Sequence, residues 1–192
     1  PTVNVDEHCE LIRVTVDHAA GRIPVIAGTG ANSTSEAIEL TEFAKKAGAD
    51  MALSVVPYYN KPTQEGLYRH FKAIAEAVDL PVLLYNVSLF TGVNLLPDAV
   101  ERLAAHPNII GMKESNADLV QLADTIARTP DDFVVLGGSA PTFYHALCAG
   151  ADGGVLAISA VVPDICVDMF DLVRKQRHAE ALALQRRITP LG

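Results

Sequence analysis

The sequence has few of the features that mark membrane, exported or nucleic-acid-binding proteins. No apolar run approaches the roughly 20 residues that a helix needs to cross a bilayer, and no basic stretch followed by an apolar one stands at the start to act as a signal segment. Acidic residues outnumber basic ones by 23 to 15, and the basic residues are nowhere clustered enough to follow a phosphate backbone. These absences predict a cytoplasmic protein with no membrane and no nucleic-acid partner.

Cysteine is also scarce. The chain has three, Cys9, Cys148 and Cys166, which are far apart, and no two of them have the spacing of metal ligands. We expect them to be reduced, buried side chains set in helices. The six histidines fall in predicted helices or at helix ends, so none is assigned to catalysis. The sequence therefore predicts no metal site.

What the chain has in quantity is apolar residues, 49% of the total, arranged in short runs. Six of these runs predict β-strands, and amphipathic helices alternate with them. Their near-continuous apolar character is typical of parallel strands that are covered on both faces. The predicted strands are Ile23–Ala27, Met51–Val56, Pro81–Val87, Ile109–Lys113, Phe133–Gly137 and Gly154–Ile158.

Local signals mark where the helices begin and end. Ser33 and Glu36 have the spacing of a capping box, and Thr63 predicts a second N-cap. Gly48 and Gly150 stand where left-handed residues commonly end helices. Three prolines stand where a first helical turn would begin and where their missing N–H costs nothing, namely Pro97, Pro141 and Pro163.

Repeated strand–helix units leave two α/β architectures, an open doubly wound sheet or a (β/α)8 TIM barrel. A nucleotide-binding open sheet would need Gly-x-Gly-x-x-Gly after its first strand, and Gly28 and Gly30 supply only two of those glycines. A barrel places its chemistry at the C-terminal ends of its strands. Polar residues gather there in this sequence: Tyr58, Tyr59, Tyr85, Asn86, Lys113, Glu114, Ser139 and Ser159. We therefore predict the barrel.

The predicted strands are fewer than a complete barrel requires. A complete barrel has eight strands and about 250 residues, whereas we predict six strands in 192 residues. The chain opens on a predicted helix, Asp6–Ala20, and closes within another, Ala179–Ile188. We expect a barrel that lacks its first two strands in this sequence, with residues 1–175 as the partial barrel and 176–192 as the start of a C-terminal helical segment. Its open edges would need cover from another chain or segment.

Lys113 ends the apolar run that begins at Ile109. An ammonium group flanked by Ile and Met at a strand tip is expensive to desolvate, and this favours the neutral amine, which attacks carbonyl carbons and forms Schiff bases. The alternative is a side chain that extends past the strand into water. Considered alone, Lys113 favours the exposed side chain. The residues around it favour the Schiff-base interpretation instead.

Two aromatic features accompany the lysine. Tyr85 ends the run that begins at Val82, on the neighbouring predicted strand, and a phenol beside a carbinolamine can carry protons to and from its oxygen. A lone tyrosine more commonly caps a core with its ring. The loop Tyr58–Pro62 is rigid, polar and aromatic, and it suits equally the wall of a site and a contact with a second subunit.

Other residues near the strand ends have weaker signals. Glu114 follows Lys113 directly, and because successive strand residues face opposite ways we expect it to point away from the site. Glycine pairs at 137–138 and 153–154 fall at the last two predicted strands. Loops there often bind phosphate in barrels, although such glycines can also serve close backbone packing.

With Tyr85 and Lys113 at adjacent strand ends, the chain resembles the dihydrodipicolinate synthase and N-acetylneuraminate lyase superfamily over essentially its whole length. The segments that carry the resemblance are 27–32, 57–62, 85–87, 91–92, 111–114 and 153–155. It implies a class I pyruvate-dependent aldolase or lyase without a cofactor. Lys113 would form the Schiff base and Tyr85 would transfer protons. Tyr59 would reach across a dimer interface, Leu156 would lie beside the bound 2-oxo acid, and the protein would be a homo-oligomer, a dimer or tetramer.

The chain departs from the family pattern in two places. The Gly-Thr-Thr-Gly-Glu-like loop that holds the pyruvate carboxylate in family members does not occur here, and its place would lie upstream of Pro1. Phe90 stands where the lysine-pathway synthases have an arginine, and an apolar ring cannot pair with a carboxylate. The segment 106–118 is also similar to 4-hydroxy-2-oxoglutarate aldolases of the same superfamily.

These observations leave three hypotheses. The first is a Schiff-base 2-oxo acid (pyruvate) aldolase or lyase that acts on a small 2-oxo acid and an aldehyde, either dihydrodipicolinate synthase-like or 4-hydroxy-2-oxoglutarate aldolase-like. The second is a non-catalytic barrel fragment that lacks the carboxylate-binding loop. The third, a phosphosugar-binding barrel built on the two glycine pairs, ranks last because Lys113 is the only basic residue at its site.

Overall fold

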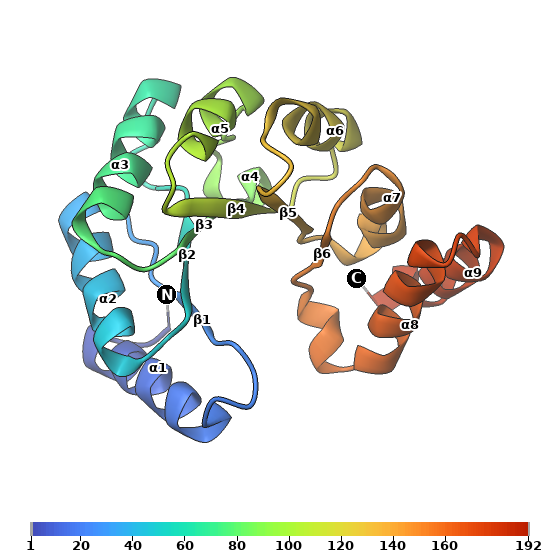
Figure 1. Ribbon diagram of the computed structural model, residues 1–192, viewed down its shortest axis with the longest axis horizontal. Coiled ribbons are helices and arrows are strands. Elements are labelled where there is room, and N and C mark those ends of the chain that lie inside the picture. Colours follow the sequence, from blue (N-terminus) through green and yellow to red (C-terminus); the bar gives the residue numbers. More distant parts are fainter. Residues whose placement is uncertain (1, 192) are drawn as a thin grey trace. The chain divides into compact units, whose positions relative to one another are not determined.

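The computed structural model describes residues 2–191, which form two compact units, one running through Ile110 and the other from Gly111 onward. Parallel strands alternate with helices along the chain in both units (Figure 1). The predicted α/β class with repeated strand–helix units is therefore confirmed. The strand β4 (Ile109–Glu114) contains the boundary, so its last four residues belong to unit 2.

Unit 1 is built on three parallel strands, β1 (Ile26–Gly28), β2 (Met51–Val55) and β3 (Val82–Asn86), hydrogen-bonded in that order. Ile26 pairs with Met51, and Val55 pairs with Tyr85. The helices of this unit are α1 (Val5–Ala19), α2 (Thr34–Ala47), α3 (Gln64–Ala77), α4 (Ser88–Thr91) and α5 (Pro97–Ala104). In this register the C-terminal ends of the three strands come to one edge.

The helices of unit 1 pack side by side in the order α1, α2, α3 and α5 (Figure 1). In α3 the apolar residues at helical spacing, Leu67, Phe71 and Ile74, are completely buried. A second group of buried residues joins α1 and α2 to the strands, with Ile12, Ala44 and Ala52 among its members. The small alanines let these helices lie close to the sheet.

In unit 2, β4 pairs in parallel with β5 (Val134–Gly137), and β5 pairs with the short β6 (Gly153–Gly154). The α-helices are α6 (Leu119–Arg128), α7 (Phe143–Cys148), α8 (Pro163–Arg174) and α9 (His178–Ile188). Three short 3₁₀ helices complete the unit, η1 (Ala140–Thr142), η2 (Ala157–Ala160) and η3 (Thr189–Leu191). Its apolar core is formed by α7, η2, α8 and α9, and includes Phe143, Leu156, Met169 and Ile188.

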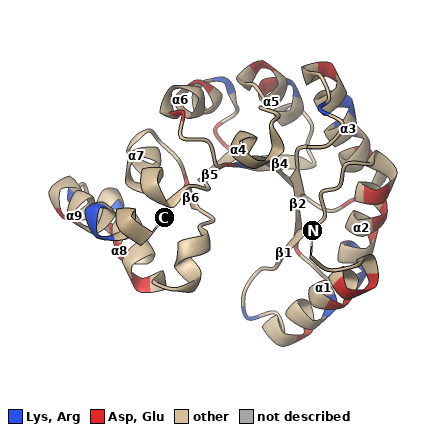
Figure 2. Cartoon of the chain, turned by 180° about the vertical axis from the view of Figure 1, so that it is seen from behind, with Lys and Arg blue, Asp and Glu red and all other residues tan. Residues whose placement is uncertain are grey.

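Charged side chains lie mainly on the helices of each unit, with acidic and basic residues interspersed (Figure 2). On α1, Arg13 lies 2.6 Å from Glu10 and 2.7 Å from Asp17, and on α6, Arg128 lies 2.8 Å from Asp124. These exposed pairs contribute little stability each, because water screens them. Among residues 2–191, no helix is long and apolar enough to cross a membrane, and no group of three His, Cys, Asp or Glu side chains is placed to hold a metal ion.

Several predicted helix boundaries are confirmed. Thr63 caps α3, where its Oγ1 accepts a hydrogen bond from the Gly66 amide at 3.2 Å. Gly48 and Gly150 have φ values of 92° and 109°, in the left-handed region that glycine adopts without strain. The three prolines lie in the first turns of α5, η1 and α8.

The predicted capping box at Ser33 is wrong. Ser33 precedes α2, but its side chain bonds no helix amide and lies 2.9 Å from the Ser35 hydroxyl instead. A capping box does form elsewhere, at the start of α1. There Asn4 accepts from the Glu7 amide and the Glu7 carboxylate accepts from the Asn4 amide, both at 2.9 Å.

The predicted strand at 154–158 is also largely wrong. Only Gly153 and Gly154 pair as β6, and Ala157–Ala160 form the 3₁₀ helix η2. The amides of Val161 and Val162 both bond the Ile158 carbonyl, which curls the chain and buries the Ile158 side chain in the apolar core. An apolar run bounded by turns is compatible with either structure, so periodicity alone did not separate them.

The cysteines only partly follow the prediction. Cys166 is buried in α8, Cys9 is half-buried, and Cys148 is exposed at the end of α7. All three are free thiols and all lie in helices. Cys148 is the last residue of a short helix, where apolar neighbours on the same turn already fill the buried side.

Candidate functional site

Tyr85 lies near the C-terminal end of β3, where its carbonyl accepts a hydrogen bond from the Val56 amide at 3.0 Å. The next residue, Asn86, is completely buried and turns the other way. Its amide group donates to the Asn94 side chain and the Leu95 carbonyl, and its Oδ1 accepts from the Leu95 amide at 3.0 Å. Asn86 therefore anchors the loop that follows β3, and Tyr85 is left on the face that lines a cavity.

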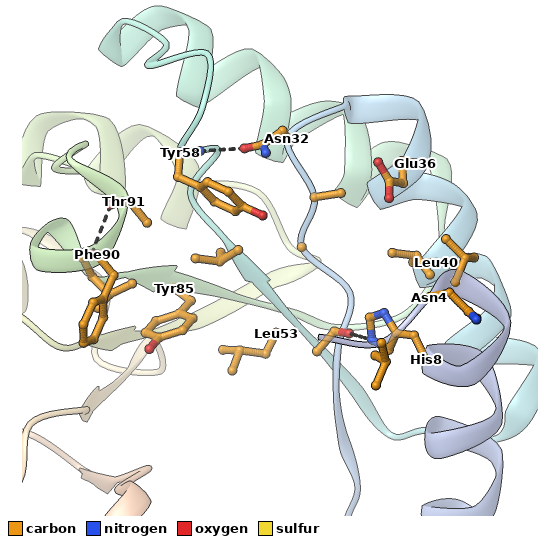
Figure 3. Close-up of a pocket in the computed structure, with 17 residues that line it drawn as sticks. Asn4, His8, Asn32, Glu36, Leu40, Leu53, Tyr58, Tyr85, Phe90 and Thr91 are labelled. Atoms are coloured by element: carbon orange, nitrogen blue, oxygen red, sulfur yellow. Dashed lines mark hydrogen bonds between the residues drawn. The ribbon is translucent and has the colours of Figure 1, made fainter. Parts of the chain in front are cut away.

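That cavity has a volume of about 740 Å³ and lies entirely within unit 1 (Figure 3). Side chains from the first turn of α1 and from the ends of all three strands surround it. The ring of His8 approaches the strand end through a 2.8 Å hydrogen bond between its Nε2 and the Gly28 carbonyl. The other polar or aromatic lining residues include Asn4, Asn32, Glu36, Tyr58, Tyr85, Phe90 and Thr91.

One asparagine holds two of the loops at this edge together. Asn32 follows β1, and its Oδ1 accepts hydrogen bonds from the Tyr58 amide at 2.7 Å and the Tyr59 amide at 3.2 Å. The Asn60 side chain returns a bond to the Asn32 carbonyl. Gly30 allows this approach, because a Cβ there would lie 2.3 Å from the Val55 nitrogen. The segments 27–32 and 57–62 thus form one hydrogen-bonded structure.

Two aromatic residues predicted from the sequence are highly exposed. Tyr59 is 88% exposed although its backbone is held by Asn32, so its ring projects from a fixed loop. Phe90, in α4, is 82% exposed and lies at the rim of the cavity beside Thr91. Thr91 is buried, and its hydroxyl donates to the carbonyls of Val87 and Val93. The Thr91–Gly92 pair therefore shapes the turn that presents Phe90.

Lys113 lies in the unit 2 part of β4, in register with Leu136 of β5. Its side chain is half-buried and passes over Gly138, where an added Cβ would lie 2.8 Å from the Lys113 Cε. The Gly138 amide donates to the Glu114 carbonyl at 2.7 Å, which fixes this approach. The missing side chain at Gly138 is what leaves room for the lysine.

Glu114 faces away from Lys113, as predicted from strand alternation. It is 2% exposed, and its carboxylate accepts hydrogen bonds from the Asn116 amide at 2.9 Å and the Gln121 side chain at 3.2 Å. Both partners lie at or before the start of α6. Glu114 thereby ties the end of β4 to the helix that follows it.

Leu156 is 6% exposed and belongs to the apolar core of unit 2. Its carbonyl accepts from the Ser159 hydroxyl at 2.7 Å, at the start of η2. The glycine pair at 153–154 serves close packing here, because a Cβ on Gly154 would lie 2.5 Å from the Phe143 ring. This contact favours the packing explanation of these glycines over phosphate binding.

Residues that sequence reasoning missed lie in both units. In unit 1, Asn32 and His8 shape the cavity, and no local pattern indicates that residues 8, 32 and 85 line one space. In unit 2, Ser115 lies near Lys113 at the Gly138 position, with its Oγ 1.9 Å from the place of an added Cβ. Ser115 follows the end of β4, and its place only two residues after Lys113 is the signal that could have found it.

Comparison with known proteins gives a consistent result. A model of the Dihydrodipicolinate synthetase family matches residues 1–192. The 4-hydroxy-tetrahydrodipicolinate synthase of Dechloromonas aromatica is 55% identical over 193 residues, which cover 97% of this chain and 66% of that protein. The chain therefore spans slightly less than two thirds of the length of that relative.

Solved structures agree with the sequence relatives. The 4-hydroxy-tetrahydrodipicolinate synthase from Methylacidiphilum fumariolicum SolV superposes with a TM-score of 0.97 at 40% identity, covering 100% of this chain and 64% of that one. The chloride-inhibited dihydrodipicolinate synthase from Acinetobacter baumannii, solved with pyruvate, gives 0.94 at 44% identity, covering 99% and 65%. The family match over the whole chain and these likenesses show that the chain belongs to the dihydrodipicolinate synthetase family.

Proposed function

We propose that this chain carries the chemistry of a Schiff-base-forming 2-oxo acid aldolase or lyase, with pyruvate as the 2-oxo acid. The observation that carries the proposal is the position of Lys113 at a strand end, packed over Gly138, in a chain that matches the family throughout. A lysine held in this way presents one amine in a fixed direction, as an imine-forming nucleophile requires.

The proposed reaction begins when the Lys113 Nζ attacks C2 of pyruvate. The carbonyl oxygen takes up protons and leaves as water, which leaves a protonated imine between C2 and Nζ. Loss of a proton from C3 gives an enamine, because the imine accepts the electron pair. The enamine carbon then bonds to the aldehyde carbon, whose oxygen takes up a proton, and water hydrolyses the resulting imine to release the product and restore the Lys113 amine. Tyr85 would carry the protons to and from oxygen, a role for which its place in the cavity wall is suited.

Phe90 provides information about the identity of the acceptor aldehyde. Its exposed ring at the cavity rim offers no charge to a carboxylate, so we propose an acceptor less acidic than that of the lysine-pathway synthases. The names of the relatives favour 4-hydroxy-tetrahydrodipicolinate synthesis instead. Turnover with aldehydes that carry or lack a carboxylate separates the two, and a strong preference for the carboxylate would contradict our assignment of Phe90.

We also propose that the six strands β1–β6 correspond to the third to eighth strands of a (β/α)8 barrel. The parallel strand–helix order within each unit supports this, as does the match to part of longer relatives. On this proposal, residues 1–175 form the partial barrel and residues 176–192 form the start of a C-terminal helical segment.

We also propose that the protein is a cytoplasmic homo-oligomer in which the exposed Tyr59 enters the neighbouring copy. A Tyr59→Ala variant should then shift towards monomer in sedimentation.

The decisive experiment is mass analysis after incubation with pyruvate and borohydride, which reduces the imine to a stable adduct. We expect one adduct per chain, mapped to Lys113, and none in Lys113→Ala. Lys175→Ala is the matched control, because Lys175 is an exposed lysine of the same unit, paired with Asp171. A folded protein that forms no adduct would favour the alternative of a non-catalytic fragment.

A further inference from the structure

Ser115 has a buried hydroxyl for which no structural role is visible. Its Oγ is inaccessible to water and has no hydrogen-bond partner among the residues that the structure describes. Buried hydroxyl groups are nearly always hydrogen-bonded, because an unpaired one loses its contact with water without compensation. A hydroxyl left in this state is therefore a candidate partner for a group that arrives with the substrate.

The hydroxyl lies next to the Lys113 side chain. The point where Gly138 would carry a Cβ is 1.9 Å from the Ser115 Oγ and 2.8 Å from the Lys113 Cε. Both atoms thus lie where a side chain on residue 138 would have to stand, and the Lys113 Nζ is one bond beyond its Cε. Lys113 lies in β4 and Ser115 directly follows the end of that strand, and both meet Gly138, which directly follows β5.

We propose that Ser115 is a positioning residue for the imine, with its Oγ accepting a hydrogen bond from the N–H of the protonated imine formed on Lys113. This inference rests on the function proposed above. The bond would favour the protonated imine, in which the positive charge draws electrons from C2 and C3. It would also fix the plane of the imine relative to the proton that leaves C3.

A hydroxyl suits this role better than a carboxylate would. A carboxylate beside Lys113 would hold the resting amine as an ammonium ion, which is not nucleophilic. The nearest carboxylate in sequence, that of Glu114, is turned away and bonded to Asn116 and Gln121. A hydroxyl at residue 115 can thus accept a hydrogen bond from the charged imine without adding a negative charge beside the lysine.

The test compares Ser115→Ala and Ser115→Thr with the unchanged protein, using borohydride trapping of pyruvate on Lys113 across a range of pH. A hydrogen bond to a charged group is expected to change the trapped fraction about tenfold. We expect Ser115→Ala to require about tenfold more pyruvate for half-maximal trapping, and to lose trapping at a pH about one unit lower. Ser115→Thr keeps the hydroxyl and should restore most of both properties.

Thr129→Ala serves as the control, because it removes a hydroxyl of the same unit that bonds backbone carbonyls at the end of α6, and it should leave trapping unchanged. Trapping in Ser115→Ala that equals the unchanged protein at every pH would overturn the role of Ser115 and leave the proposed function intact. Equal losses in Ser115→Ala and Ser115→Thr with an unshifted pH profile would also overturn it, since they indicate packing alone. If the unchanged protein formed no adduct, the proposed function and this inference would both fail.

Discussion

The two units present their polar residues at the strand ends by different means. In unit 1, hydrogen bonds from Asn32 and Asn86 hold three loops around a cavity of about 740 Å³, and Tyr85 lines its wall. In unit 2, Lys113 is held by close packing over Gly138, which the Ser115 hydroxyl also approaches. Unit 1 therefore shapes an open space with polar groups and the bare backbone at Gly30, whereas unit 2 positions its lysine through the missing side chain at Gly138.

The contrast indicates which changes each unit should tolerate. A cavity shaped by loops can accept a changed side chain on its wall, as long as the hydrogen bonds behind it remain. A lysine packed on a glycine has no such freedom, because any added atom must displace either Lys113 or Ser115. Four experiments test this contrast, in order of decreasing effect.

The strongest loss should follow when one proposed reacting group is removed from each unit. Lys113→Ala should abolish both the trapped adduct and turnover, because it removes the amine that we propose forms the imine. Tyr85→Phe should still form the adduct, although more slowly, and should slow turnover by about 10²- to 10⁴-fold, the usual contribution of one proton-transfer group. Trapping and steady-state assays on both variants give the comparison, and an adduct lost in Tyr85→Phe would remove the distinction between the units.

The next effect concerns backbone packing in unit 1. Gly30→Ala places a Cβ 2.3 Å from the Val55 nitrogen, and Val55 cannot move without breaking the pairing of β2 with β3, so we expect a loss of about 3 kcal/mol or more of unfolding free energy. Gly28→Ala is the matched control, since nothing lies within 4 Å of a Cβ there. Urea titration measures both. Similar midpoints for the two variants would show that the loops of unit 1 move more freely than this packing implies.

A smaller effect depends on pH and on His70 of unit 1. Its side chain is 5% exposed, its Nδ1 lies 2.9 Å from the Thr34 hydroxyl, and burial lowers its pKa from 6.5 to about 4. The unfolded chain therefore binds a proton at higher pH than the folded one. The contribution of His70 to the unfolding free energy is fully present above pH 6.5 and falls as the pH drops from 6.5 towards 4.

This contribution of His70 should amount to about 2 kcal/mol between pH 7 and pH 5. His70→Gln cannot take up the proton, so its unfolding free energy should depend less on pH than that of the unchanged protein. The exposed His18→Gln provides the control. Denaturant titrations at several pH values measure the difference, and parallel curves for the unchanged protein and His70→Gln would contradict the effect of burial.

The smallest difference is between two thiols within unit 2. Cys148 is exposed, whereas Cys166 is 7% exposed and burial raises the pKa of its thiol. Iodoacetamide should therefore label Cys148 first in the folded protein, and both equally after unfolding. Peptide mapping over time gives the order. Early labelling of Cys166 would mean that the apolar core of unit 2 opens readily.

Much of the local structure could be predicted because its causes are local. Thr63 caps α3 through a bond to an amide three residues away, and Gly48 ends α2 through its own backbone angle. Tyr85 and Lys113 were expected at strand ends because apolar runs precede them, and both lie in strands β3 and β4. The predictions that failed rested on local signals that are compatible with more than one structure. The apolar run at 154–158 is an example, because its last two residues begin η2 instead of continuing a strand.

The alternation of strands and helices, the family, and the residues that the proposed chemistry requires all follow from the amino-acid sequence alone. They rest on periodicity, on caps and on motifs whose members are close in the chain. The folded structure was needed to show that His8, Asn32 and Tyr85 border one cavity, that Ser115 lies against Lys113, and that Cys148 is exposed. The physical reason is that cavities, close contacts and burial depend on atoms that are distant in the sequence, and no local pattern restricts the distances between them.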